Sequence, residues 1–542
     1  MLTAPSMSYV TTLPYAAIPL LSAQLKKAGY EVFSRDLSIE FFRDISTPKA
    51  IKKSYNKIIK IKKKTKTANN EEFQKLKQIY SYLLGTFREK RATKAYQKKV
   101  LLGFTLYPYK HKANIANANG KFNINSIYEY CANKDINFYI TYLEEKIKKL
   151  PNSYDIICLS KIPDYDLNGI LTLARLLKRK YKDKKIIIGG YWFSSIIEEL
   201  KNHPRFFDDF CHFVMTGDGE NALVELVKHL NGELDIMEVS NVMYKNEKNE
   251  IIHNKKSSQI NINELEFPDY SDYDFSNYES ESPMISMFFS KGCYWGKCKF
   301  CTYNNGKNFQ IKTIDNAIKE IKLYTENYGI KHIHFCDDAI KPQYYNKLAN
   351  AIIKNNIKIT FESFAILDDD FSYEILKNCK DAGLSKLVWG LETNSKKVFD
   401  IANKSGCFDK RSEILMNSHN AGIYNQVNVI EGLPGENIED LIQTVKFIHD
   451  NLEYIDTLSI QKFQLRVGSE FCDKAEEYGL IKKGKNDFSL YYKFDYQDSN
   501  LTEENSFINF LGTPTNNSTT YDKDFLREAT KKYLEKFAPE LL

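Results

Sequence analysis

Short apolar runs alternate with amphipathic helical patterns along most of this chain, and this alternation restricts its possible folds more than any other feature. Early in the chain the clearest runs are YDIICLS at 154–160, KKIIIGG at 184–190 and CHFVMTG at 211–217. Apolar strands that alternate with helices form a parallel sheet covered by helices on both faces. We therefore expect an α/β fold whose first domain is a doubly wound parallel sheet. Met1 to Ala4 would supply a short first strand and Glu31 to Phe33 a second one.

The alternation resumes near residue 284 with six further apolar runs, which are MISMFFS, KHIHFCDD, KITFESFA, KLVWGLET, QVNVIEGLPG and LSIQKFQL. Six strand–helix units predict a partial (β/α)6 barrel, whose site should lie at the C-terminal ends of the strands. The expected parts are a first domain at 1–240 with a Lys-rich helical insertion at about 40–150, a linker at 241–280, the barrel at 281–466 and a C-terminal segment of unknown role at 467–542.

Charge and hydropathy exclude several classes of protein. The 76 basic and 70 acidic residues leave a net charge of +6 over 542 residues, which gives no argument for nucleic acid or membrane lipid. The basic run at 51–66 has lysines at helical spacing, as on a solvated helix face. No run of about 18 apolar residues occurs, and no basic region precedes an apolar core at the N-terminus. We therefore expect neither a membrane span nor a signal peptide, and a cytoplasmic location with reduced thiols.

Three of the ten cysteines, Cys293, Cys298 and Cys301, fall close together in SKGCYWGKCKFC. The stretch follows the first barrel strand, where a loop can present three thiolates to one metal centre and leave a fourth position open. One possibility is a cubane iron–sulfur cluster whose free iron binds a further molecule. The other is structural zinc, with a fourth ligand from among His332, His334 and Cys336. Spacing alone leaves both possibilities open.

The residues around these cysteines are more specific. The loop GCYWGKCKFC, with an aromatic residue before its third cysteine, resembles the cluster loop of the radical S-adenosylmethionine (SAM) superfamily. The resemblance extends to FCDD at 335–338, GLET at 390–393, AGIYNQVNVIEGLPGE at 421–436 and LRVGSE at 465–470. TGDGEN at 216–221 and the linker ELEFPDYSDYDF match as well. Together these motifs resemble the branch of the superfamily that carries an N-terminal cobalamin-binding-like domain.

One departure concerns the spacing in the loop. Four residues, Tyr294 to Lys297, separate the first two cysteines, whereas the family usually has three. Gly296 can adopt a backbone conformation that accommodates an extra residue. We therefore still expect all three cysteines to be cluster ligands.

The resemblance implies a chemistry and its cofactors. The three cysteines would bind a [4Fe-4S] cluster whose open iron chelates SAM. An electron from the reduced cluster would split SAM into methionine and a 5′-deoxyadenosyl radical, with the protein supplying orientation and exclusion of water. Such a protein needs an electron donor such as flavodoxin or ferredoxin, and its substrate would be a peptide or a small molecule. The individual catalytic residues are not identified by the sequence.

The resemblance also implies a set of residues that hold SAM, all near C-terminal strand ends. They are Phe300, Asp337, Asp338, Glu392, Gly432 and Gly435. The two aspartates can instead cap the next helix, Glu392 can instead pair with Lys404, and the two glycines can belong to an ordinary turn. Phe364, in FESFA, stands where many relatives carry a basic residue, which makes Glu362 a weaker candidate.

In the first domain the resemblance implies contacts to cobalamin from the loops after three strands. The matching residues are Ser160, Gly189, Gly190, Gly217 and Glu220. Glycine at these positions permits close approach of a flat ring, although it is also ordinary turn chemistry. The cobalt-ligating pattern Asp-x-His-x-x-Gly is absent from this domain. We therefore expect the lower face of any bound corrin to be open, to hold water, or to be blocked by a side chain of the 160–166 loop.

Three hypotheses follow. The first is a cobalamin-dependent radical SAM enzyme, with methyl transfer as one outcome. The second keeps radical SAM chemistry but makes the N-terminal domain a vestige that binds no cobalamin. The third, from a different class, is a zinc-stabilised binding protein without catalysis.

Overall fold

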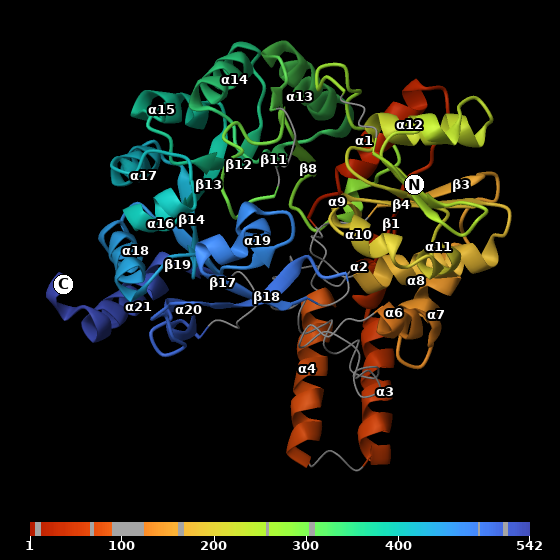
Figure 1. Cartoon of the computed structure of the whole chain (residues 1–542), viewed down its shortest axis with the longest axis horizontal. Helices are drawn as coiled ribbons and strands as arrows, with labels where there is room; N and C mark the ends of the chain where they lie inside the picture. Colours follow the sequence, from red (N-terminus) through yellow and green to blue (C-terminus); the bar gives the residue numbers. More distant parts are fainter. Residues whose placement is uncertain are drawn as a thin grey trace. The chain divides into compact units, whose positions relative to one another are not determined.

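The computed structural model describes residues 1–5, 12–65, 70–88, 124–160, 167–255, 260–302, 309–485, 488–512 and 519–542. These residues form two compact units, which are described separately below (Figure 1). The first unit contains the described residues of 1–260, 264–283 and 486–489, and the second contains those of 261–263, 284–485 and 490–542.

The first unit is built on a seven-stranded sheet in the order β2-β1-β3-β4-β5-β6-β7. Its strands are β1 (Leu2–Thr3), β2 (Arg35–Asp36), β3 (Ile156–Ser160), β4 (Lys185–Gly189), β5 (Phe213–Met215), β6 (Val242–Lys245) and β7 (Ile251–Asn254). The pairs from β2 to β5 are parallel, whereas β6 and β7 add an antiparallel edge. The chain reverses its direction of winding between β1 and β3, and ligands of such sheets bind at the strand ends there.

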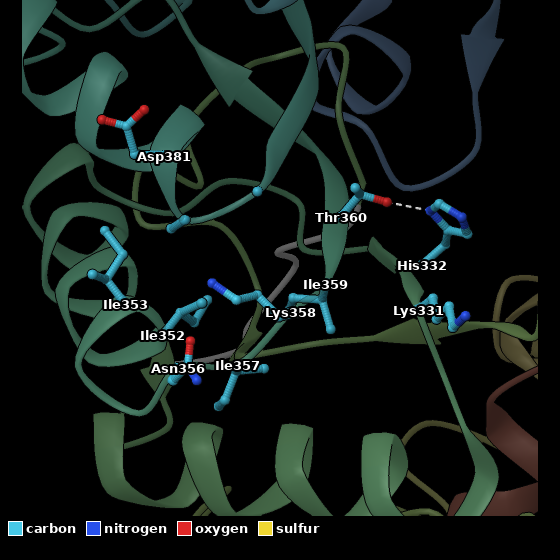
Figure 2. Close-up of a pocket in the computed structure, with 12 residues that line it drawn as sticks. Lys331, His332, Ile352, Ile353, Asn356, Ile357, Lys358, Ile359, Thr360 and Asp381 are labelled. Carbon is cyan, nitrogen blue, oxygen red and sulfur yellow. Dashed lines mark hydrogen bonds between the residues drawn. The ribbon is translucent and has the colours of Figure 1, made fainter.

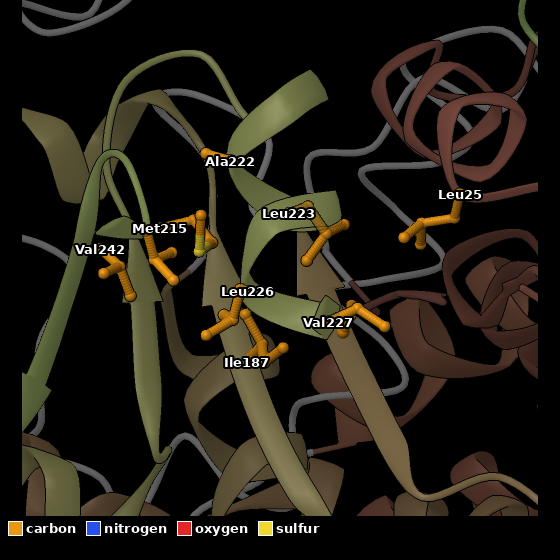
Figure 3. Close-up of a cluster of buried hydrophobic side chains, with 10 residues drawn as sticks. Leu25, Ile187, Met215, Ala222, Leu223, Leu226, Val227 and Val242 are labelled. Atoms are coloured by element: carbon orange, nitrogen blue, oxygen red, sulfur yellow. The ribbon is translucent and has the colours of Figure 1, made fainter. Parts of the chain in front are cut away.

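Helices cover both faces of this sheet, which confirms the expected doubly wound arrangement (Figure 1). α1 (Ala17–Lys27) and α12 (Glu220–Leu230) lie on one face, and α8 (Leu167–Lys180) lies on the other. Figure 3 shows the buried apolar cluster on the first face, to which Leu25 of α1, Leu226 of α12 and Ile187 of β4 belong. Gly29, at φ 89°, ends α1 in the left-handed conformation that glycine tolerates best.

The second strand differs from the sequence-based expectation. It lies at Arg35–Asp36 rather than at Glu31–Phe33, because the parallel ladder to β1 begins where the Arg35 N–H donates to the Met1 carbonyl at 2.9 Å. Val32 instead packs against the apolar cluster. It is apolar because it is partly buried there, and it pairs with no described strand. Apolar character alone did not distinguish these two situations.

The described part of the long insertion is helical. It contains α2 (Leu37–Ile45), α3 (Pro48–Thr65), α4 (Asn70–Arg88), α6 (Ile124–Ala132) and α7 (Phe138–Ile147). The Lys-rich helix α3 runs beside α4, and Tyr55 stacks on Tyr80 with ring centroids 4.4 Å apart (Figure 1). Three short helices follow β4, namely α9 (Tyr191–Ser194), α10 (Ile197–Lys201) and α11 (Arg205–Asp209).

The second unit contains the predicted partial barrel. Its sheet has the order β19-β15-β14-β13-β12-β11-β8, with six parallel strands and the antiparallel β19 at one edge. The parallel strands are β8 (Met284–Met287), β11 (His332–Phe335), β12 (Thr360–Ile366), β13 (Leu384–Glu392), β14 (Tyr424–Glu431) and β15 (Thr457–Lys462). β8 and β19 (Thr519–Asp522) are the two edges, so the barrel is open.

Six helices follow the strands and lie along the outer side of this sheet (Figure 1). They are α13 (Ile314–Tyr328), α14 (Pro342–Lys354), α15 (Tyr373–Asp381), α16 (Lys396–Ile401), α17 (Arg411–Asn420) and α18 (Ile438–Asp450). Because the strands are parallel, all of their C-terminal ends lie at one edge of the sheet. Any site built from the loops that follow them is therefore gathered at that edge.

The C-terminal segment, in which we found no motif, completes this unit. β19 extends the barrel sheet, and α21 (Lys523–Phe537) packs beside α18. A smaller sheet has the order β16-β18-β17, from β16 (Leu465–Arg466), β17 (Leu480–Gly484) and β18 (Tyr491–Tyr496). Its aromatic residues Phe494 and Tyr496 pack against Leu433, which follows β14. The segment thus supports the loops at the C-terminal edge of the barrel.

Candidate active site

The three clustered cysteines lie on one loop after β8, at the C-terminal edge of the barrel sheet. Cys293, Cys298 and Cys301 are each partly buried, and Cys293 forms an isolated parallel bridge with Ala339, which follows β11. Burial raises the pKa of the Cys298 thiol to about 11, against the opposing charge of Lys404. This thiol therefore keeps its proton until a metal displaces it.

The four residues between the first two cysteines are anchored to the loop after α16. The indole Nε1 of Trp295 donates to the carbonyl of Asn403 at 2.8 Å, and the Asn403 amide donates to the carbonyl of Lys297 at 3.1 Å. Gly296 has a φ of 63°, a conformation that most other residues adopt only with strain. The extra residue is thus accommodated by a left-handed turn and fixed by hydrogen bonds on both sides of it.

The remainder of the loop is held from the opposite direction. The Lys299 N–H donates to the Ala402 carbonyl at 3.0 Å, and the Lys299 carbonyl accepts from the Phe471 N–H at 3.0 Å. Phe300 packs against an apolar cluster that includes Leu433. Phe300 and the turn after β14 are therefore neighbours, as the SAM-site expectation requires.

Asp337 supports the cysteine loop from beneath. Its Oδ1 accepts hydrogen bonds from the Phe289 N–H at 2.8 Å, the Ser290 N–H at 2.5 Å and the Ser290 hydroxyl at 2.7 Å. Its Oδ2 is buried, and no described residue supplies it with a hydrogen-bond partner. Burial raises the pKa of Asp337 to about 6 in spite of these bonds.

The alternative role of this acidic pair, capping the next helix, is wrong. α14 begins at Pro342, its N-cap is Lys341, and no side chain caps it. Asp338 is exposed, in contrast to Asp337. Asp337 holds the segment that leads into the cysteines through its bonds to Phe289 and Ser290.

Glu392 ends β13 in an unusual backbone conformation. Its φ is 62°, and the pairing of β13 with β14 is irregular between Gly390 and Glu392. Its carboxylate folds back over Gly390: a Cβ added to Gly390 would lie 2.7 Å from Glu392 Oε1 and 3.1 Å from Lys404 Nζ. Lys404 Nζ is 3.9 Å from that oxygen, so the predicted alternative pairing is present. Burial raises the pKa of Glu392, and Lys404 opposes the shift.

Gly432 and Gly435 form the turn after β14, with φ of 85° and 83°. An added Cβ would lie 2.9 Å from the Tyr496 hydroxyl at Gly432 and 2.6 Å from Ile401 Cδ1 at Gly435. The Glu436 carboxylate accepts a hydrogen bond from the Gly432 N–H, and burial raises the pKa of Glu436 to about 8. Contacts within the protein therefore explain these glycines without a ligand.

The histidine at the start of β11 is not placed to complete a zinc site. The imidazole of His332 is hydrogen-bonded to Thr360 at the amino ends of β11 and β12, as Figure 2 shows. Both residues line a cavity of about 410 Å³ together with Ile357 and Lys358. This cavity is at the N-terminal end of the strands, whereas the cysteine loop follows a C-terminal end.

In the first unit, the five residues proposed for cobalamin line one cavity of about 200 Å³. Ser160, Gly189 and Gly217 stand at the C-terminal ends of β3, β4 and β5, and Gly190 and Glu220 adjoin them. Ile187, Met215 and Leu223, which are labelled in Figure 3, form part of its floor. Residues 161–166 of the loop expected beneath a corrin lie outside the described residues.

Sequence reasoning missed other residues of this cavity. The cavity is also lined by Tyr15, which precedes α1, by Leu21 within α1 and by Tyr191 after β4. Gly219 lies beside Leu21, whose Cδ2 would be 3.3 Å from an added Cβ. The available signal was the amphipathic pattern of α1, whose apolar side had to cover the sheet near its switch point.

Comparison with known proteins agrees with this geometry. Residues 287–448, from the end of β8 to α18, match the model of the radical SAM superfamily. An uncharacterized methyltransferase, PH0819, of Pyrococcus horikoshii is 23% identical over 310 residues, which are 54% of this chain and 66% of that protein. The bacteriochlorophyllide d C-12(1)-methyltransferase of Chlorobaculum tepidum is 23% identical over 58% of this chain and 65% of its own length. The chain thus spans slightly less than two thirds of these relatives.

Solved structures resemble both units. The radical SAM methyltransferase TsrM of Kitasatospora setae, determined with cobalamin and a [4Fe-4S] cluster, aligns over 99% of each chain with a TM-score of 0.57 and 12% identity. The cobalamin-dependent radical SAM enzyme OxsB, with aqua-cobalamin bound, aligns over 66% of this chain and 58% of its own with a TM-score of 0.56 and 17% identity. At these identities the likeness establishes the fold, so the expected layout of a sheet domain followed by a partial barrel is confirmed. The match to the radical SAM superfamily model lies in the barrel, at residues 287–448.

Proposed function

We propose that this protein is an enzyme that uses a [4Fe-4S] cluster on Cys293, Cys298 and Cys301 to cleave SAM reductively. The observation that carries the proposal is the loop itself. It presents three partly buried cysteines at the C-terminal edge of a parallel barrel, beside a carboxylate in a strained conformation at Glu392. Strain that the surrounding structure maintains is typical of functional positions.

The donor set fits a cluster better than zinc. Tetrahedral zinc with bonds of about 2.3 Å brings its thiolates to within roughly 3.8 Å of one another. Among the described residues, the only three Cys, His, Asp or Glu side chains with ligand atoms within 4.8 Å of each other are Asp368, Asp369 and Asp370. In a cubane each thiolate binds a different iron, so its ligands stand further apart. The spacing in this loop therefore supports the cluster.

Bound and reduced, the cluster would supply the electron that breaks the bond between sulfur and C5′ of SAM. The residues of this chain would then bind and orient the cosubstrate. Glu392 is suited to the SAM amino group or ribose, because the positive charge of Lys404, 3.9 Å from its carboxylate, favours the charged form of that carboxylate. Phe300 and the turn from Gly432 to Gly435 are suited to adenine, since they adjoin the same apolar cluster. Asp337 would hold the cysteine loop, and the exposed carboxylate of Asp338 would contact SAM.

We further propose that the first unit binds cobalamin and that the reaction is a methyl transfer to a peptide or small metabolite. The cavity of about 200 Å³ is suited to the nucleotide tail of cobalamin. Gly189, Gly190 and Gly217 line it and permit close approach, and Ser160 and Glu220 would be polar contacts. The names of the solved structures support the binding of cobalamin, and the names of the relatives support a methyl transfer. The corrin ring itself would lie outside this cavity, which is too small to hold it.

The partners follow from the chemistry. The cluster needs a one-electron reductant, for which flavodoxin or ferredoxin is our proposal. A reducing compartment such as the cytoplasm would keep the three ligand cysteines reduced and available to the cluster. No helix in the part of the chain that the structure describes is both long and apolar enough to cross a membrane.

The test is to reconstitute the protein anaerobically, add SAM and dithionite, and measure 5′-deoxyadenosine. We expect slow formation without substrate, its loss in the triple variant Cys293→Ala, Cys298→Ala, Cys301→Ala, and normal formation in Cys379→Ala. Cys379 is buried in α15, away from the loop, and is the matched control. Formation in the triple variant would overturn the ligand assignment.

A second experiment tests the first unit. The protein is incubated with hydroxocobalamin, the excess is removed and a visible spectrum is recorded. Absence of retained corrin would favour a domain without cobalamin.

A further inference from the structure

The barrel sheet carries a row of three ionisable side chains on neighbouring strands. His334, Glu362 and Lys386 occupy paired positions on β11, β12 and β13. Their neighbours along each strand, such as Ile333 and Leu387, are buried on the side of the sheet that the helices cover. Because side chains alternate along a strand, the charged row faces the interior of the open barrel.

This interior differs from that of a closed barrel, which is filled by layers of branched apolar side chains. The side chains of His334, Glu362 and Lys386 retain 24%, 32% and 29% of their exposure. Three ionisable groups at adjacent positions cannot form a dry core. The row is therefore accessible to water or to a ligand.

Glu362 organises the row. One of its oxygens lies 2.9 Å from His334 Nδ1, and the other lies 3.9 Å from Lys386 Nζ. The hydrogen bond from His334 and the charges of both neighbours lower the pKa of Glu362, so it is an anion that orients its two partners. Among the described residues, neither His334 Nε2 nor Lys386 Nζ has a hydrogen-bond partner. Lys386 Nζ can therefore donate to a ligand, and His334 Nε2 can donate as well when the ring is protonated.

An exposed aromatic ring adjoins these donors. Phe364 lies two residues beyond Glu362 on the same face of β12 and keeps 36% of its exposure. Its ring meets the imidazole of His334 edge to face, with ring centroids 5.8 Å apart at 81°. A large apolar side chain that stays exposed next to unpartnered donors is typical of a ligand-binding surface.

We propose that this row anchors an anionic group of the substrate, a carboxylate or a phosphate, on Lys386 Nζ and on the Nε2–H of protonated His334, with Phe364 against the apolar part next to that group. Glu362 is a positioning residue. The proposal rests on the proposed function, since it names the class of substrate for the same barrel. Lys386 precedes Glu392 by six residues on β13, or roughly 20 Å along the strand. The substrate is therefore an elongated organic anion whose reacting end extends toward the cysteine loop.

The test measures binding of small aryl probes to the full-length reconstituted protein by titration calorimetry. The probes are phenyl phosphate, benzoate and the neutral benzyl alcohol. We expect at least one of the two anions to bind and the alcohol not to, and the stronger anion tells a phosphate from a carboxylate. Lys386→Gln and His334→Gln should each weaken that affinity roughly tenfold or more. Lys347→Gln, at an exposed lysine of α14, should leave it unchanged.

Two results would overturn the proposal: neither anion binds better than the alcohol, or Lys386→Gln binds the anion as the parent does. Glu362→Gln keeps the shape of the side chain and removes its charge. It should weaken the affinity for the anion, because His334 and Lys386 are then oriented less firmly. Dithionite-driven formation of 5′-deoxyadenosine is measured without substrate in the parent and Lys347→Gln samples, and it should be normal in both. Its absence in the parent would contradict the proposed function and would leave the anion site standing.

Discussion

Gly390 and Glu392 act as one unit at the end of β13. The carboxylate occupies the space in which a side chain at Gly390 would stand, and a left-handed φ at Glu392 directs it there. Only glycine at position 390 leaves that space open. The motif GLET therefore encodes a placed carboxylate, in addition to its strand.

Gly390→Ala should weaken SAM binding by roughly 1–3 kcal/mol, because its methyl group displaces the carboxylate from its charged partner Lys404. Glu392→Gln, which keeps the shape and loses the charge, should weaken binding by a similar amount. Titration calorimetry with SAM, beside a thermal melt of each variant, is the measurement. Unchanged SAM affinity in both variants would make Glu392 a structural residue only.

Glu436 should make the stability of the barrel depend on pH. Burial raises its pKa from 4.5 to about 8, so between these values the folded state binds a proton that the unfolded state has lost. Stability from this group is complete below about pH 4.5 and is lost as pH rises to about 8, by roughly 1.4 kcal/mol per pH unit at most. Relative to Glu436→Gln, the parent should therefore be progressively less stable from pH 5 to pH 8 in urea unfolding. A constant difference between the two proteins across this range would contradict a raised pKa.

For single residues, the sequence predicted which of them lie at the site better than it predicted what each one does there. The cysteines, Glu392 and the two glycines after β14 stand at the strand ends where the motifs indicated. The sequence could not separate Asp337, which accepts three hydrogen bonds, from the exposed Asp338 beside it. Nor could it reveal the row of His334, Glu362 and Lys386, because that row exists only through the register of three strands.

Among the elements, the cysteine loop depends on Trp295. Its indole bond to Asn403 fixes the segment that carries the extra residue. Trp295→Phe should therefore shorten the lifetime of the bound cluster, with iron lost to a chelator about five- to tenfold faster, since a hydrogen bond contributes about 1 kcal/mol.

Trp389→Phe is the matched control, because Trp389 Nε1 also makes one hydrogen bond, to Asn425 Oδ1 at 2.9 Å, but in the buried core. It should lower the melting temperature without changing the rate of iron loss. Equal rates of iron loss in the two variants would show that Trp295 does not position the loop.

Element by element, strands bounded by glycine and helices with clear periodicity were predictable, as the six barrel strands illustrate. The strands that were placed wrongly from the sequence, or not predicted from it at all, had weak local signals. β2 has only two residues, and its ladder to β1 sets its position. β19 pairs with β15 across more than fifty residues of sequence, so no local pattern could reveal it.

On the scale of the whole molecule, the two units should support separable binding functions. Gly219 has an ordinary φ of −96° and borders the cavity of the first unit, so a larger side chain fits its backbone but fills the cavity. Gly219→Leu should lose hydroxocobalamin retention, measured by the visible spectrum after desalting, while dithionite-driven SAM cleavage continues. Full retention of corrin by this variant would contradict the assignment of the cavity.

We propose a cluster on the three cysteines of one loop, with one iron open to SAM. Electron paramagnetic resonance of the dithionite-reduced, anaerobically reconstituted protein tests it most directly, together with iron and zinc analysis. We expect about four irons per chain and a reduced-cluster signal that changes shape when SAM is added. The triple cysteine variant should show neither. A colourless protein that holds zinc, or a cluster signal that SAM leaves unchanged, would contradict it.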